Sequence, residues 1–177
     1  PLEEKLTTIL IKYGLDSQKV MDSWKSQTHW GLYADLEGNL FWMQSLEREE
    51  KGVVKFLFDQ YGICNFSRYD FEELIDQYRN HADDTLPYGI VITPHHDSNG
   101  AFRDYSAIWA DLAQQLKGKY RLRFIEAQSK SDILGRLKQC HQVHPNHKIG
   151  FLFLGGHGSP ESINFGGEGQ GKKLLKD

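Results

Sequence analysis

Three short apolar runs in the second half of the chain constrain the fold most strongly. They are residues 88–94 (YGIVITP), 121–127 (RLRFIEA) and 148–156 (KIGFLFLGG). Two segments between them, 103–120 and 129–143, carry apolar residues at helical spacing. The order strand, helix, strand, helix, strand predicts a parallel sheet with right-handed crossovers. The second run alternates like a strand near a sheet edge, and the third is the most apolar, so we expect the third to be central.

The chain up to residue 86 has a different pattern and is predicted to be mainly helical. Apolar residues recur at helical spacing over residues 2–13. Asp16 and Asp70 stand where helix N-caps are expected, and a further helix is predicted to begin at Ser45.

Residues 30–44 (WGLYADLEGNLFWMQ) are the predicted exception, because aromatic residues alternate around a turn-like Glu-Gly-Asn and favour a short strand or hairpin. The fold class is therefore α/β: a mainly helical N-terminal domain over residues 1–86, then a parallel sheet with flanking helices over residues 87–177.

Polar residues follow the first and third predicted strands. These are PHHDSNG at 94–100 and GGHGSP at 155–160. The carboxyl ends of parallel strands lie at one edge of a sheet, so both clusters are expected to meet there. The glycines around His157 allow a close backbone approach, and an imidazole with an ordinary pKa of about 6.5 suits a general base. A capped turn whose histidine bonds a carbonyl group is the alternative.

The loop at 94–100 has two interpretations. His95, His96 and Asp97, together with His157, offer nitrogen and oxygen ligands for a metal such as zinc. A turn of Asp, Ser, Asn and Gly that caps the following helix accounts for the same residues without a metal. We predict no metal and no cofactor, and we keep a metal-dependent hydrolase as an alternative.

The cysteines and the remaining histidines receive structural roles. His141, His144 and His147 fall where the last helix ends, at the edge of the sheet opposite the predicted site, and are assigned to a solvated helix end rather than to zinc. Cys140 lies within that helix at the same edge, too far from the predicted site to be the partner of His157, and is rejected as the nucleophile. Cys64 is predicted to be a small buried hydrophobic residue.

Composition excludes several classes of protein. The 177 residues suffice for one sizeable domain or two small ones, and the net charge is −3 from 21 basic and 24 acidic residues, so we expect neither nucleic acid nor membrane as a partner. No apolar run approaches the roughly 18 residues of a membrane span. Two widely separated cysteines suit a reducing compartment, and a cytoplasmic protein is expected.

The chain from residue 89 to residue 167 resembles the caspase-like cysteine peptidases, with clostripain-like and CHAT-type members closest. The resemblance lies in GIVIT, DSNGAFRD, YSAIWADLAQQL, RLRFIEA, SKSDILGRL and FLFLGGHGSPESINFGG, in this order. It covers about half of the chain, and CHAT-type similarity implies a bacterial protein.

The resemblance implies roles for particular residues. His157 corresponds to the family's catalytic histidine, and Gly158 to the glycine whose amide stabilises the oxyanion. A short hairpin is expected after His157. Arg103 stands near the position of a caspase pocket arginine, so Arg103 and the nearby Asp97 are expected to contact a protein or peptide substrate.

The family's nucleophilic cysteine lies some tens of residues beyond the histidine, so here it is expected on a segment beyond residue 177 or on a second chain. Cleavage after Asp177 would suit caspase-like processing. The resulting hypothesis is a cysteine endopeptidase in which this chain supplies the histidine of a Cys/His dyad and is inactive alone. The alternative is a non-catalytic caspase-like module that binds a protein partner.

Overall fold

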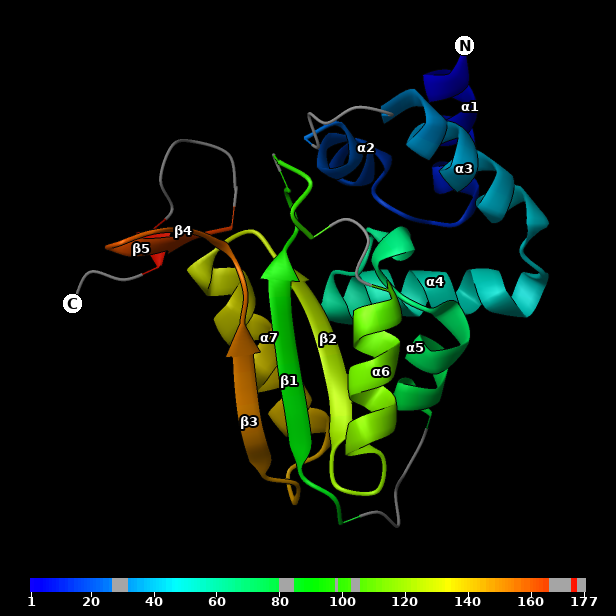
Figure 1. Ribbon diagram of the computed structural model, residues 1–177. Coiled ribbons are helices and arrows are strands. Elements are labelled where there is room, and N and C mark those ends of the chain that lie inside the picture. The colour runs from blue at the N-terminus through cyan, green and yellow to red at the C-terminus, as the bar shows by residue number, and fades with distance from the viewer. Residues whose placement is uncertain (27–31, 80–84, 98, 103–105, 166–172, 175–177) are drawn as a thin grey trace.

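The computed structural model describes residues 1–26, 32–79, 85–97, 99–102, 106–165 and 173–174, and Figure 1 shows how they are arranged. The helical elements are α1 (Leu2–Lys12), α2 (Ser17–Lys25), α3 (Leu32–Ser45), α4 (Arg48–Tyr61), the short 3₁₀ helix η1 (Phe66–Arg68), α5 (Phe71–Tyr78), α6 (Ser106–Leu116) and α7 (Lys130–Val143). The strands are β1 (Tyr88–Pro94), β2 (Arg121–Ala127), β3 (Ile149–Leu154), β4 (His157–Ser159), β5 (Ser162–Asn164) and β6 (Lys173–Leu174).

The main sheet is parallel, as predicted, with the order β2-β1-β3. The expectation that the most apolar strand is central is wrong: β1 occupies the centre and is buried along its whole length, whereas β3 lies at an edge. Ile149, Leu152 and Phe153 of β3 are 52%, 49% and 48% exposed. No strand pairs with the outer edge of β3 among the residues that the structure describes.

Helices cover both faces of this sheet. In Figure 1, α6 lies in front of the strands and α7 behind them. On α6, Trp109 packs against Phe124 of β2 and Phe153 of β3, at ring-centroid distances of 5.8 and 6.1 Å. The spacing of Ile108, Leu112 and Leu116 predicts that these residues share the inner face of this helix. Ile108 is instead 53% exposed, because the helix is rotated so that Trp109 and Ala113 face the core. On α7, helical spacing predicts that Leu134 faces inward, but this side chain is also exposed.

The hairpin predicted over residues 30–44 is not formed, since helix α3 occupies most of this segment. Leu36, Leu40 and Met43 follow one another at steps of four and three, and all three pack into the core. Burial of this helical face prevails over the turn-like sequence and the aromatic alternation.

Helix starts follow short-range hydrogen bonds. Asp16 and Asp70 accept from the backbone N–H of Lys19 and Glu73, at 3.0 and 2.9 Å, which confirms both predicted caps. Helix α4 does not begin at Ser45 but three residues later, where the Glu50 carboxylate accepts from the backbone N–H of its N-cap residue Glu47.

The N-terminal helices and the sheet contribute to one buried hydrophobic cluster, which runs from Leu6 to Phe165. Polar contacts also connect them. Trp24 of α2 donates its indole N–H to the carbonyl oxygen of Cys64 at 2.8 Å, and Ser23 donates to the carbonyl oxygen of His95 at 2.5 Å. In the described parts of the chain, no helix combines the length and the apolar character needed to cross a membrane.

Candidate active site

His157 lies where the sequence predicted, beyond the carboxyl end of β3 and at the first position of β4. The Gly155 N–H donates to the carbonyl oxygen of Ile92 at 2.9 Å, which ties the start of this turn to the central strand. Strands β4 and β5 then form the expected hairpin, with His157 opposite Asn164. The imidazole is held at the sheet edge and keeps 21% of its surface exposed.

Asp97 is the principal polar neighbour of His157. Its carboxylate has no exposed surface, and Oδ1 lies 3.1 Å from Nε2 of His157, an ion-pair distance without the alignment of a linear hydrogen bond. Oδ2 accepts from the backbone N–H of Phe102 at 2.8 Å, and the Phe102 ring stands edge-on to the imidazole at 5.4 Å. Nε2 is buried against the carboxylate, so Nδ1 is the candidate nitrogen for proton transfer.

The contact between Asp97 and His157 confirms the prediction that the two loops meet at one edge of the sheet. Asp97 was expected to contact substrate, and the structure places its carboxylate under His157 instead. Gly158 is exposed and pairs with Ile163 in the hairpin. Arg103 lies outside the described residues.

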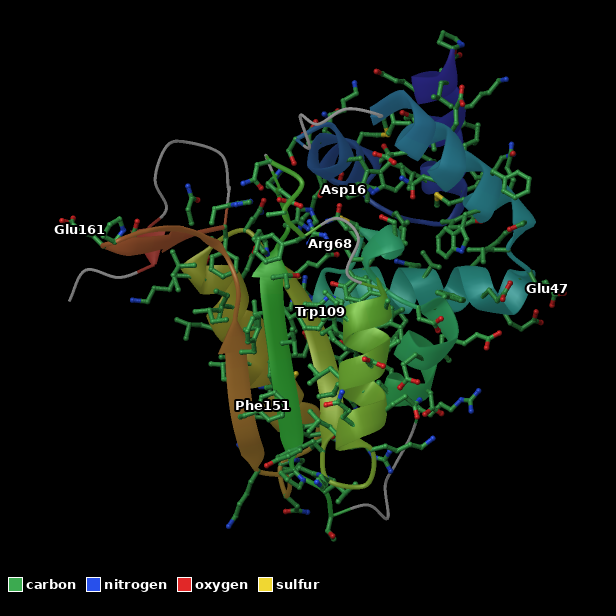
Figure 2. The ribbon with its side chains drawn as sticks, viewed as in Figure 1. Asp16, Glu47, Arg68, Trp109, Phe151 and Glu161 are labelled. Carbon is green, nitrogen blue, oxygen red and sulfur yellow. The ribbon has the colours of Figure 1, made fainter. Side chains whose placement is uncertain are left out.

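A buried charge cluster beneath the loop was not predicted. Arg68 of η1 is 1% exposed, and Figure 2 shows it near the carboxyl end of β1. Its Nη1 donates to the Pro94 carbonyl oxygen at 2.6 Å and to Glu126 Oε1 at 3.1 Å, and its Nη2 lies 4.0 Å from Asp97 Oδ2. Burial raises the pKa of Glu126, and the nearby Arg68 opposes this shift.

Cys64 contacts His95 rather than His157. The sulfur lies 3.5 Å from Nδ1 and 3.6 Å from Nε2 of His95. A sulfur equidistant from both nitrogens in the ring plane would clash with the carbon between them, so it stands out of that plane and away from either lone pair. Burial raises the pKa of the thiol well above its ordinary value and lowers that of His95 to about 3. The pair is therefore a neutral thiol beside a neutral imidazole, which is not an activated nucleophile.

One group of side chains in the described part of the chain has the composition and spacing of a metal site: Cys64, His95 and Glu126, whose ligand atoms lie within 4.8 Å of one another. However, the Glu126 carboxylate already accepts four hydrogen bonds, from the N–H groups of Cys64 and Asn65, from the Asn65 amide and from Arg68. Because a carboxylate has about four acceptor positions, none is left for a cation. The alternative ligand set of His95, His96, Asp97 and His157 does not form such a group.

The histidines after α7 lie at the opposite edge of the sheet, as predicted. His144 and His147 pack against Tyr88, the first residue of β1, with ring centroids 5.0 and 5.3 Å away. Nδ1 of His147 also lies 2.9 Å from the carbonyl oxygen of Leu86. These contacts give the two rings a packing role.

No protein-family model matches this sequence, and no curated protein or solved structure shows significant similarity to it.

Proposed function

We propose that this chain is the histidine-bearing part of a caspase-like cysteine endopeptidase. The observation that carries the proposal is the contact of His157 with Asp97: a partly exposed imidazole at the carboxyl edge of a parallel sheet, with one nitrogen 3.1 Å from a fully buried carboxylate. Parallel α/β sheets place their reactive groups at this edge. A buried carboxylate that orients an imidazole is the arrangement by which enzymes fix the nitrogen that transfers protons.

The chemistry is peptide-bond hydrolysis through an acyl-enzyme. His157 takes the proton of a cysteine thiol on another segment, and the thiolate attacks the carbonyl carbon to form a carbon–sulfur bond. The carbon–nitrogen bond then breaks as His157 passes that proton to the leaving amine. Water, deprotonated by His157, then attacks the acyl carbon, the carbon–sulfur bond breaks, and His157 returns the proton to the sulfur. The backbone N–H of Gly158 is the proposed donor to the oxyanion. Cys64 and Cys140 do not suit the nucleophile, because both are buried and burial raises the pKa of both thiols.

The exposed edge of β3 supports a complementary segment. A strand that paired in parallel with β3 would end beside His157, because parallel strands share one carboxyl edge. It would also cover Leu152 and Phe153, which are about half exposed. Exposed apolar edge strands favour pairing with a further strand.

The test uses a polypeptide that contains this chain together with the segment bearing the nucleophilic cysteine. Its activity is measured on a fluorogenic peptide library, with a peptidyl fluoromethyl ketone as a covalent probe. His157→Ala is expected to abolish turnover and labelling without changing the circular dichroism spectrum, whereas the exposed control His141→Ala retains both. Activity that survives His157→Ala, or a folded assembly that neither cleaves nor takes up the probe, would overturn the proposal; the second result would favour a non-catalytic binding module.

A further inference from the structure

Arg68 connects the N-terminal half of the chain to the loop that carries Asp97. Arg68 belongs to η1, which precedes the sheet in the chain. Its guanidinium lies between two carboxylates: Glu126 belongs to β2, and Asp97 follows β1. All three side chains are at most 2% exposed. Attraction between charges in such a buried setting is only weakly screened by water.

The contacts of Arg68 hold two parts of the loop. Nη1 donates to the carbonyl oxygen of Pro94, the last residue of β1, and so fixes the point where the loop leaves the sheet. Nη2 faces Oδ2 of Asp97 at 4.0 Å, beyond hydrogen-bond distance, so this interaction is electrostatic. The same Oδ2 accepts from the Phe102 N–H, while Oδ1 faces His157.

We propose that Arg68 is a positioning residue: it holds the Asp97 carboxylate in the place from which that carboxylate orients His157. Glu126 in turn holds Arg68, since it accepts from Nη1 and balances its charge. The helical N-terminal half would thus contribute to the reactive edge of the sheet without touching substrate. The inference rests on the proposed function for its catalytic meaning, but the placement of Asp97 can be measured without any activity.

The measurement is amide hydrogen exchange by NMR on the intact chain, with two amides compared. The Phe102 N–H donates to Asp97 and reports on the carboxylate. The Gly155 N–H donates to the backbone of Ile92 at the same edge and reports on the sheet alone. Arg68→Met alone would leave Glu126 buried without its counter-ion, so the main variant is Arg68→Met combined with Glu126→Gln, which removes both charges.

In the double variant, exchange of the Phe102 amide is expected to accelerate at least tenfold while that of Gly155 stays within twofold. Arg79→Met, a matched change at an exposed arginine, is expected to leave both amides near wild type. Glu126→Gln alone removes one contact that holds Arg68 and is expected to accelerate exchange at Phe102 less than the double variant does. Unchanged exchange at Phe102 would show that Asp97 is held without Arg68. Equal acceleration at both amides would show a general structural role, and either result would overturn the proposal.

A second measurement, the kinetics of the complete assembly, distinguishes failure of this inference from failure of the proposed function. In the complete assembly, the double variant is expected to lower kcat at least tenfold with little change in KM, since Arg68 does not reach substrate. If the assembly proves inactive from the start, the peptidase proposal fails, whereas the exchange experiment still decides whether Arg68 places Asp97.

Discussion

The sulfur of Cys64 lies 3.5 Å from Nδ1 of His95, yet both side chains are almost completely buried. Thus a thiol beside an imidazole, the pair that a cysteine peptidase needs, occurs within this chain where neither group is ionised. The imidazole at the sheet edge, His157, contacts a carboxylate and reaches solvent. Burial and charge, rather than residue type, distinguish the two sites.

Cys64 is expected to react very slowly with iodoacetamide. Burial raises the pKa of its thiol, and the reagent must wait for the protein to open. At pH 8 the native rate should be on the order of 10³-fold below that of a free cysteine, and it should recover fully in guanidinium chloride. Mass spectrometry of the labelled protein measures this. Rapid labelling of the native protein at Cys64 would contradict the assignment of a structural role.

Acid is expected to destabilise the fold through His95. Burial lowers its pKa from 6.5 to about 3, helped by the positive charges of Lys19 and Arg68. Below pH 6.5 the imidazole of His95 binds a proton in the unfolded chain but stays neutral in the folded chain. The contribution of His95 to the free energy of unfolding is therefore complete above pH 6.5 and falls by up to about 1.4 kcal/mol per pH unit towards pH 3. Glu126 acts in the opposite direction: burial raises its pKa, so the folded chain binds this proton more readily than the unfolded chain and acid favours the fold at this group.

Comparison with His95→Asn isolates the histidine from the other titrating groups. Urea unfolding of wild type and variant between pH 7.5 and pH 4.5 should give a smaller loss of stability with acid in the variant, whereas His141→Asn at an exposed position should follow wild type. Parallel curves for wild type and His95→Asn would show that His95 titrates normally.

Asp97→Asn should impair the complete enzyme. The amide is isosteric, but it lacks the charge that favours the protonated imidazole during catalysis, and kcat is expected to fall by on the order of 10² to 10⁴. Steady-state kinetics with a peptide substrate measure the loss, and the melting temperature checks the fold. A kcat within twofold of wild type would remove Asp97 from the mechanism.

Gly62→Ala should destabilise the protein more than Gly118→Ala. Both glycines have positive φ angles, +71° and +80°, so alanine is strained at either position. At Gly62 a Cβ would also collide with the carbonyl oxygen of Glu126, whereas nothing lies within 4 Å at Gly118. Chemical unfolding should therefore show a cost of about 1 kcal/mol for Gly118→Ala and about 2–4 kcal/mol for Gly62→Ala. Equal costs would mean that the backbone after α4 shifts enough to remove the collision with the Glu126 carbonyl oxygen.

Features that depend on neighbouring residues could be predicted from the sequence. The caps Asp16 and Asp70 act on backbone groups three residues away, and the apolar runs of the three strands are local too. The contact between Asp97 and His157 could also be predicted, because parallel strands place the loops after their carboxyl ends at the same edge of the sheet.

Features that depend on distant pairing could not be predicted. The position of β3 at the edge follows from which strands pair, and its apolar composition does not reveal this. Arg68 and Glu126 are separated by 58 residues, and nothing in the residues around either one indicates a buried ion pair. In α3, the inward-facing residues Leu36, Leu40 and Met43 have helical spacing, but the alternating aromatic residues of the same segment favour a strand in the sequence.

The connection between α4 and η1 has a consequence for how this chain tolerates insertions and deletions. Gly62 turns the chain, Cys64 and Asn65 donate to Glu126, and Arg68 reaches Pro94, all within seven residues. One added or lost residue would shift every later group out of register with its partner, even if each side chain were kept. The length of this segment should therefore be constrained as strictly as its composition, and a gene library that varies length should spare it.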